Sequence, residues 1–300
     1  MRVTEGYMPY LGFRTYWRLV EPDEPEASHA PLVLLHGGPG STHNYFEVLD
    51  PLADLDHRTL VMYDQLGCGN SWDDGMADRP DLWTYDTWDL ELAALRDELG
   101  LSRCHLLGQS WGGMLALEYL IDRRPQGVAT VVLSSTLAST RLWGQEAHRR
   151  LRYLSAEERA AVAEAERTGS YDVPAFRAAE AHYLELFCAG APGPDDPECL
   201  RRPKRAGRES YLATQGDNEL SPTGIFRTWD YSDRLGEVSV PALVVSGTQD
   251  LCSPLIAKQM ADGIPDARWE LFVGCRHMCF VEDTPRYLAL MQEWLDAHDA

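Results

Sequence analysis

The residues able to do chemistry centre on a serine between two glycines. Ser110 lies in the run Gly-Gln-Ser-Trp-Gly at 108–112, after an apolar stretch at 104–107 and before a helical pattern at 114–121. A strand, a tight turn and a helix around Gly-x-Ser-x-Gly form a nucleophile elbow, which presents the serine hydroxyl above a sheet edge. Glycine avoids Cβ clashes in so tight a turn. The pattern predicts nucleophilic catalysis by Ser110.

A serine hydroxyl is a weak nucleophile, so it requires a base beside it. Two later residues meet this need: Asp250 follows an apolar stretch at 241–246, and His277 follows another at 267–273. Imidazole exchanges protons near pH 7, and a carboxylate on its Nδ1–H fixes the tautomer and stabilises the imidazolium. The chain order Ser, Asp, His is that of α/β-hydrolases. We therefore expect Ser110, Asp250 and His277 to form a catalytic triad.

A tetrahedral intermediate also needs N–H donors for its oxyanion. The glycine-rich run His-Gly-Gly-Pro-Gly at 36–40 follows an apolar stretch at 32–35. Such a loop after an early strand supplies one donor in α/β-hydrolases, and the residue after the nucleophile supplies the other. We expect the N–H groups of Gly38 and Trp111 to form the oxyanion hole.

The elements that must position these residues alternate between strand and helix patterns. Apolar strands are expected at 32–35, 59–63, 104–107, 128–133, 241–246 and 267–273, and helices at 86–99, 114–121, 255–264 and 285–298, after a hairpin at 6–20. Continuous apolar strands separated by helices indicate a mostly parallel central sheet flanked by helices. The expected fold class is α/β, with the α/β-hydrolase fold.

The alternation breaks between about 137 and 231, where the pattern is mostly helical. Ser155 and Glu158 form a capping-box pattern for a helix ending near Gly169, and Pro174 opens a second helix that runs to about Cys188. We expect a core domain of residues 1–136 and 232–300, with a helical cap domain at 137–231. A cap over the serine would shape the substrate and exclude water.

The amino-acid composition restricts the classes of binding partner and the cellular location that we expect. The chain has 300 residues, 44% hydrophobic content, a formal net charge of −20 and seven cysteines. Negative charge disfavours nucleic acid and anionic membrane as partners, and no apolar run approaches the length of a membrane span. An odd number of cysteines without a Cys-x-x-Cys pair, and no signal-peptide core at the N-terminus, favour the cytoplasm.

Two other patterns could indicate a function: a group of cysteines around His277 and a basic run. Cys275, His277 and Cys279 alternate, with Cys252 earlier, but zinc sites commonly pair cysteines with a second pair elsewhere, and none is present. We expect no metal and no cofactor. The basic run at 201–208 is interpreted as a solvated loop with no assigned function.

The motifs at 36–40 and 108–113, with Asp64-Gln65-x-Gly67-x-Gly69-x-Ser71 between them, resemble those of the proline iminopeptidase family of serine aminopeptidases. The resemblance covers nearly the whole chain and is firmer in the core than in the cap. The cap runs 216–220 and 228–230 look like the tricorn-interacting aminopeptidase branch of that family.

The resemblance implies hydrolysis of the amide bond after an N-terminal residue, through an acyl-enzyme. Glu219 matches a cap glutamate that holds the free α-amino group of the substrate. The tricorn-interacting branch carries a second glutamate directly after the triad aspartate, whereas this chain has Leu251 there. Gly37 and Trp229 are further candidate substrate contacts, and Trp143 is expected to line the side-chain pocket with Trp229.

The leading hypothesis is a serine aminopeptidase that acts on short peptides or amino-acid amides with a free amino group. One alternative is an esterase, amidase or lactonase acting on a non-peptide metabolite. Another is a ligand-binding protein with little turnover on a hydrolase fold. Oligomeric state and a preference for proline do not follow from the sequence.

Overall fold

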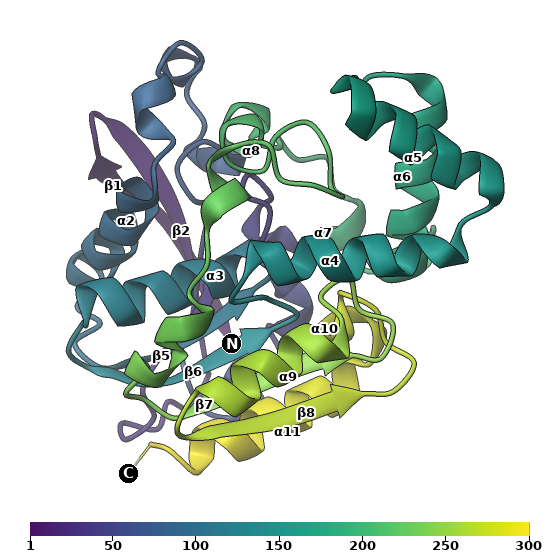
Figure 1. The fold of residues 1–300 in the computed structure, drawn as a ribbon. Helices are drawn as coiled ribbons and strands as arrows, with labels where there is room; N and C mark the ends of the chain where they lie inside the picture. The colour runs from purple at the N-terminus through teal and green to yellow at the C-terminus, as the bar shows by residue number, and fades with distance from the viewer. Residues whose placement is uncertain (300) are drawn as a thin grey trace.

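The structure is a computed structural model that describes residues 1–299. Their centre is one twisted sheet, whose strands lie in the order β1-β2-β4-β3-β5-β6-β7-β8 (Figure 1). The strands are β1 (Arg2–Tyr10), β2 (Phe13–Glu21), β3 (Leu32–Leu35), β4 (Leu60–Tyr63), β5 (Cys104–Gln109), β6 (Val128–Ser134), β7 (Ala242–Gly247) and β8 (Ala267–Phe272).

The sheet is parallel from β4 to β8, and only the first two strands run against their neighbours. β1 and β2 form the expected hairpin, in which Tyr10 pairs with Phe13, and β2 is antiparallel to β4. The pairs β3–β4, β3–β5, β5–β6, β6–β7 and β7–β8 are parallel. The expected mostly parallel α/β architecture is therefore confirmed.

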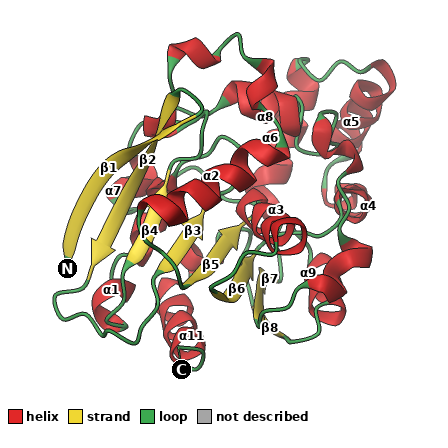
Figure 2. Cartoon of the chain, turned by 90° about the vertical axis from the view of Figure 1, so that its left-hand side faces the viewer, coloured by secondary structure: helices red, strands yellow, loops and turns green. Residues whose placement is uncertain are grey.

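Helices cover both faces of the sheet, and the central strands alternate between the two layers. Val33 and Leu35 pack with α2, α3 and α9, whereas Leu32 and Leu34 pack with α1 and α11 on the opposite face (Figure 2). Every residue of β3 is buried, as a strand covered on both faces requires. The core helices are α1 (Leu52–Leu55), α2 (Tyr85–Glu98), α3 (Trp111–Glu118), α9 (Pro254–Gly263), α10 (Cys279–Glu282) and α11 (Thr284–Asp296).

Between β6 and β7 the chain leaves the sheet and forms a mostly helical layer with its own apolar cluster. The chain leaves and returns side by side: Ser139 bridges Asp230, and the Tyr231 N–H donates to the Ala138 carbonyl at 2.8 Å. We propose 137–231 as the limits of this cap. Its helices are α4 (Thr140–Arg150), α5 (Ala156–Thr168), α6 (Pro174–Phe187), α7 (Glu198–Arg201) and α8 (Arg208–Thr214).

Most predicted elements are found within two or three residues of their expected ends. The capping box of Ser155 and Glu158 forms at α5, and Gly169 ends that helix in the left-handed conformation. The helix expected at 114–121 begins earlier, at Trp111, and passes into a π-helical turn, Tyr119–Arg123. The four-residue helix α10 was not predicted, because so short a helix has no periodicity to detect.

Short 3₁₀ helices complete the connections. They are His43–Leu49, Gly69–Ser71, Asp74–Met76, Pro80–Leu82, Leu151–Tyr153, Ile225–Thr228 and Ser232–Glu237. Across residues 1–299, every helix is too short or too polar to cross a bilayer.

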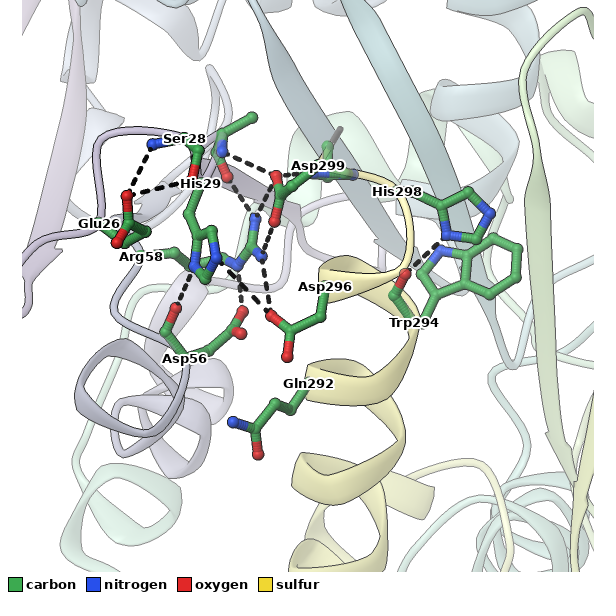
Figure 3. A network of polar contacts seen from close by, with 12 residues as sticks. Glu26, Ser28, His29, Asp56, Arg58, Gln292, Trp294, Asp296, His298 and Asp299 are labelled. Carbon is green, nitrogen blue, oxygen red and sulfur yellow. Dashed lines mark hydrogen bonds and ion pairs between the residues drawn. The ribbon is translucent and has the colours of Figure 1, made fainter.

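A buried ionic network joins the segment after α11 to the segments that precede β3 and β4 (Figure 3). The Arg58 guanidinium donates to Asp299 at 2.5 Å, to the Ala30 carbonyl at 2.6 Å and to Asp56. Asp299 also accepts from the Ala30 N–H at 2.9 Å and lies 3.1 Å from Nε2 of His105. Burial alone would raise the pKa of Asp299, but these donors outweigh it and lower the pKa to about 2.

Replacing Asp299 tests how much this network stabilises the fold. Removing one partner of a buried ion pair leaves an uncompensated charge, so we expect Asp299→Asn to lower the free energy of unfolding by roughly 3 kcal/mol. The folded-state pKa of Asp299 is depressed, so its contribution is complete above about pH 4 and is lost as pH falls toward 2. Urea titrations between pH 2.5 and 7 measure both effects.

Asp262→Asn is the matched control, because Asp262 pairs with Lys258 on the exposed face of α9. An exposed pair contributes about 0–1 kcal/mol, so this variant should unfold almost like the parent. Equal stability of Asp299→Asn and the parent at pH 7 would contradict the assigned role of the network.

Candidate active site

Ser110 occupies a strained turn between β5 and α3. Its φ and ψ are +55° and −123°, a conformation that non-glycine residues rarely adopt. Two hydrogen bonds hold it there: the Ser110 N–H donates to the Ser134 carbonyl at 3.1 Å, and the Thr136 hydroxyl donates to the Ser110 carbonyl at 2.6 Å. Strain of this kind persists where the surroundings over-determine the backbone, as at functional sites. The predicted elbow is therefore present.

The two glycines of the elbow permit backbone contacts that any side chain would prevent. A Cβ on Gly108 would lie 2.2 Å from the Gly112 carbonyl oxygen. A Cβ on Gly112 would lie 1.9 Å from the carbonyl oxygen of Leu35, at the end of β3. Because backbone atoms cannot give way as a flexible side chain can, glycine is required at both positions.

Asp250 and His277 meet above the ends of β7 and β8. The Nδ1 of His277 lies 2.8 Å from Oδ1 of Asp250, and both residues are almost fully buried. The Cys252 N–H, at 2.9 Å, and the Gly247 N–H, at 3.2 Å, also donate to the Asp250 carboxylate. This carboxylate orients the imidazole through Nδ1 and leaves Nε2 for proton transfer.

The cap contacts both triad loops directly, which the sequence did not reveal. Arg150, at the end of α4, donates to the carbonyl oxygen of Asp250. The His277 N–H donates at 3.2 Å to the carbonyl of Phe187, at the end of α6. The Arg150 guanidinium also lies 4.8 Å from the centroid of the Phe187 ring. Cap position and triad geometry are thus linked by hydrogen bonds.

The glycine-rich loop after β3 is fixed by a buried tyrosine. The Gly37 N–H donates to the Tyr45 hydroxyl at 2.5 Å, and that hydroxyl donates to Oε1 of Gln109 at 2.9 Å. The Gln109 amide continues to the His277 carbonyl at 3.4 Å. One relay of hydrogen bonds therefore connects the loop, the elbow and the histidine loop. No pattern in a single sequence points to Tyr45.

The motif beginning at Asp64 anchors the residue after the serine. The Trp111 indole N–H donates to Oε1 of Gln65 at 2.8 Å, and the Gln65 amide donates to the His36 carbonyl at 2.9 Å. Burial lowers the pKa of His36 to about 4, so the ring is neutral and accepts the Gln65 N–H at 3.0 Å. His36 is therefore a structural residue.

A small cavity of about 40 Å³ brings together Ser110, the expected oxyanion residues Gly38 and Trp111, and the cap residue Glu219. Gly38 has a φ of +117°, which favours glycine there. The remaining walls are mostly apolar. They are formed by Met114, Leu137, Thr140, Trp143, Gln215, Phe226, Leu251 and Cys252.

Glu219 has an unusual environment for a carboxylate. It accepts a hydrogen bond from the Tyr211 hydroxyl, and its N–H donates to Glu180 at 2.7 Å. Within residues 1–299 it has no cationic partner in hydrogen-bonding distance, whereas Glu180 pairs with Arg177 at 2.7 Å. Burial raises the pKa of Glu219; the Tyr211 hydroxyl opposes this and the charge of Glu180 adds to it. The site therefore favours a cationic group beside Glu219.

Two expected substrate contacts have other positions. Trp229 is buried outside the cavity lining, where its indole N–H donates to Glu118 at 3.0 Å, so it fastens the cap to α3. Phe226, three residues earlier, lines the cavity instead. Gly37 is also outside the lining; a Cβ there would lie 2.6 Å from Oε1 of Gln109. Trp143 lies in the lining, as expected.

One group of possible metal ligands, His29, Asp56 and Asp296, lies at the C-terminal end of α11. At the candidate active site the possible ligands are Asp250, Cys252 and His277, whose ligand atoms lie within 4.8 Å of one another. Cys275 and Cys279 do not belong to this group. Burial raises the pKa of the Cys252 thiol well above its usual range, and the His277 Nδ1 and Asp250 carboxylate bind each other. A protonated thiol is a poor metal ligand, so the donor set suits proton transfer better.

Comparison with known proteins agrees with this geometry. Residues 30–284 match the alpha/beta hydrolase fold family. The chain is 51% identical to the proline iminopeptidases of Clostridium botulinum, over 299 residues, and of Lactobacillus delbrueckii subsp. lactis, over 300; each alignment covers 100% of both chains. The proline iminopeptidase of Mycobacterium smegmatis has a similar structure, with a TM-score of 0.86, 33% identity and 99% coverage of both chains.

The chain belongs to the proline iminopeptidase family. Full-length coverage includes the cap, where the motif resemblance was weakest. Members of this family are serine hydrolases with the α/β-hydrolase fold, in which the nucleophile, the carboxylate and the histidine follow in the chain order of Ser110, Asp250 and His277.

Tyr45→Phe tests the relay behind the glycine-rich loop. The variant leaves the buried Gly37 N–H without an acceptor, so the loop should lose its fixed position. We expect kcat for p-nitrophenyl acetate to fall about tenfold, less than the 100- to 1000-fold typical of losing an oxyanion donor itself.

The control is Tyr10→Phe, which removes a half-buried hydroxyl that donates to the Thr87 carbonyl at 2.7 Å, away from the glycine-rich loop and from the elbow. It should keep kcat within about twofold, whatever its effect on thermal stability. Full activity of Tyr45→Phe would show that the loop does not depend on the relay.

Proposed function

We propose that this protein is a serine aminopeptidase that releases N-terminal proline from short peptides. The observation that carries the proposal is the position of Glu219. This carboxylate lines the same cavity as Ser110 and has no cationic partner among residues 1–299. An N-terminal ammonium in the cavity would supply that partner and fix the first carbonyl beside the serine. The curated relatives carry the name proline iminopeptidase, which agrees with this substrate.

In the first half of the reaction, Ser110 Oγ attacks the carbonyl carbon of the first residue. His277 takes the hydroxyl proton on Nε2, and Asp250 stabilises the imidazolium through its hydrogen bond to Nδ1. The Gly38 and Trp111 N–H groups stabilise the negative oxygen. His277 then donates the proton to the leaving amine, and the C–N bond breaks.

In the second half, a water molecule attacks the prolyl ester of Ser110. His277 takes a proton from the water, and the ester collapses to free proline while Ser110 recovers its proton. The cap surrounds these steps, since Glu219, Gln215 and Phe226 line the cavity from above the serine. Exclusion of bulk water strengthens the contact between Glu219 and the ammonium.

The cavity walls favour a small cyclic side chain. Leu251, Phe226 and Trp143 form an apolar part of the cavity lining. Leu251 is 7% exposed and also packs with the apolar cluster of the cap, where a carboxylate would be poorly solvated. One carboxylate, Glu219, therefore accompanies an apolar surface suited to a pyrrolidine ring.

We further propose that the enzyme acts in the cytoplasm. All seven cysteines are unpaired. Free thiols persist in a reducing compartment, which supports this location.

Glu219→Gln tests the proposed amine contact. We expect kcat/KM for prolyl p-nitroanilide to fall at least 100-fold, because the amide has no charge to offer the substrate ammonium. Hydrolysis of p-nitrophenyl acetate, which has no amine, should change less than threefold. A Ser110→Ala variant provides the blank for both assays.

Asp217→Asn is the matched control, because Asp217 is exposed two residues away in the same loop and lies outside the cavity lining. It should keep both activities. Equal losses on the two substrates in Glu219→Gln would contradict an amine contact. Activity of the parent on esters, with none on aminoacyl anilides, would favour an esterase.

A further inference from the structure

The basic run at 201–208 is solvent-exposed at every position but Gly207, as expected, yet its backbone packs against loops of the candidate active site. The Gly207 N–H donates to the Gly40 carbonyl at 2.7 Å, and the Gly69 N–H donates to the Arg205 carbonyl at 2.8 Å. A Cβ on Gly40 would lie 2.4 Å from the Gly207 carbonyl oxygen, so the two backbones are in direct contact. These backbone contacts therefore fix the position of the run relative to the glycine-rich loop at 36–40.

Some cations of the run are used in holding it there. Arg202 donates to Glu47 at 2.9 and 3.1 Å and to Glu198 at 2.7 Å. The Arg205 guanidinium lies 3.7 Å from the centroid of the Trp72 ring. These contacts join the cap to the core loops and leave no free charge for a ligand.

Lys204 and Arg208 differ from these residues. Both side chains are exposed, and within residues 1–299 neither has a carboxylate within 4.0 Å, in contrast to Arg202 and Arg205. The Lys204 Nζ lies 5.7 Å from the centroid of the Tyr45 ring, whose hydroxyl fixes the Gly37 N–H. Two unpaired cations thus lie beside the oxyanion loop of a chain with a net charge of −20.

A cleft of about 340 Å³ separates these cations from the loop. It is lined by residues 38–42 on one side and by Lys204, residues 206–208 and Tyr211 on the other. The cleft and the cavity over Ser110 share Gly38, and the Tyr211 hydroxyl donates to Glu219 between them. The cleft therefore adjoins Gly38, whose N–H is expected to bind the oxygen of the scissile carbonyl.

We propose that this cleft binds the remainder of the peptide beyond the scissile bond, and that Lys204 and Arg208 bind its free terminal carboxylate. The proposal rests on the function proposed above and specifies its substrates: short peptides, about two to four residues long, with an ionised C-terminus. Glu219 recognises the positive end of the substrate and the basic pair recognises the negative end. A longer peptide or a blocked C-terminus loses the second contact.

The test compares each peptide acid with its own amide: Pro-Gly with Pro-Gly-NH₂, and Pro-Gly-Gly with Pro-Gly-Gly-NH₂. For the parent, we expect the amide to have a KM roughly two to five times that of the acid, the range for a partly exposed charge contact. In Lys204→Gln combined with Arg208→Gln, the ratio of the two KM values should approach one. Raising the salt concentration from 20 to 500 mM should reduce the parent ratio in the same direction.

Arg201→Gln is the matched control: Arg201 is an exposed cation of the same run that donates to the Asp196 carbonyl and lies outside the cleft lining. It should leave the ratio unchanged. An equal KM for acid and amide in the parent, or the same ratio in the double variant, would overturn the subsite.

Prolyl p-nitroanilide, which lacks a carboxylate, separates this outcome from failure of the proposed function. If the parent hydrolyses the anilide but has the same KM for peptide acids and amides, only the proposed carboxylate subsite is contradicted. No hydrolysis of any prolyl substrate removes both proposals.

Discussion

The contact between two backbones, at Gly112 and Leu35, sets the geometry of the whole site. Since Gly112 has no Cβ, the first turn of α3 can approach the end of β3 until the main chains touch. The glycine-rich loop leaves β3 directly after Leu35, and Ser110 lies two residues before Gly112. The two expected oxyanion donors thus come from segments whose separation is fixed by this contact. A strained serine is maintained because its neighbours have no freedom to relax.

The cap takes part in this arrangement and does more than cover it. Arg150 binds the Asp250 carbonyl, Phe187 accepts from the His277 N–H, and Arg276 reaches back to the Glu185 carbonyl at 2.6 Å. Asp250 and His277 are therefore each held by the core on one side and by the cap on the other. The substrate contacts proposed for the cap and the proton transfer proposed for His277 would therefore depend on the same hydrogen bonds between cap and core.

The sequence predicted what local patterns encode. The strands around Ser110, the alternation of strand and helix, the capping box at Ser155 and the pairing of Asp250 with His277 all follow from periodicity, turn chemistry and chain order. It did not predict contacts made across long separations by residues without a distinctive pattern. Tyr45, Arg150 and Phe226 look like ordinary apolar or surface positions until the fold assembles them.

The error at Trp229 has the same origin. A large aromatic residue in a cap suggests a pocket wall, but its indole N–H binds a buried glutamate on α3, and this partner cannot be read from spacing. The basic run at 201–208 is solvent-exposed, as its composition predicts, but its position beside the site does not follow from composition. Backbone contacts between glycines 40 and 207, which place it at the site, carry no periodic signal.

The side-by-side positions of Ser139 and Asp230 have an evolutionary consequence. Since the chain leaves and rejoins the core at one place, the segment between them can lengthen, shorten or be exchanged while its ends stay pinned, and closing a longer loop adds little entropy cost. Descendants of one hydrolase core could therefore acquire new substrates by remodelling a single insertion. Such change is limited by the cap groups that hold Asp250 and His277, namely the Arg150 guanidinium and the Phe187 carbonyl. A replacement cap would have to supply equivalent hydrogen bonds.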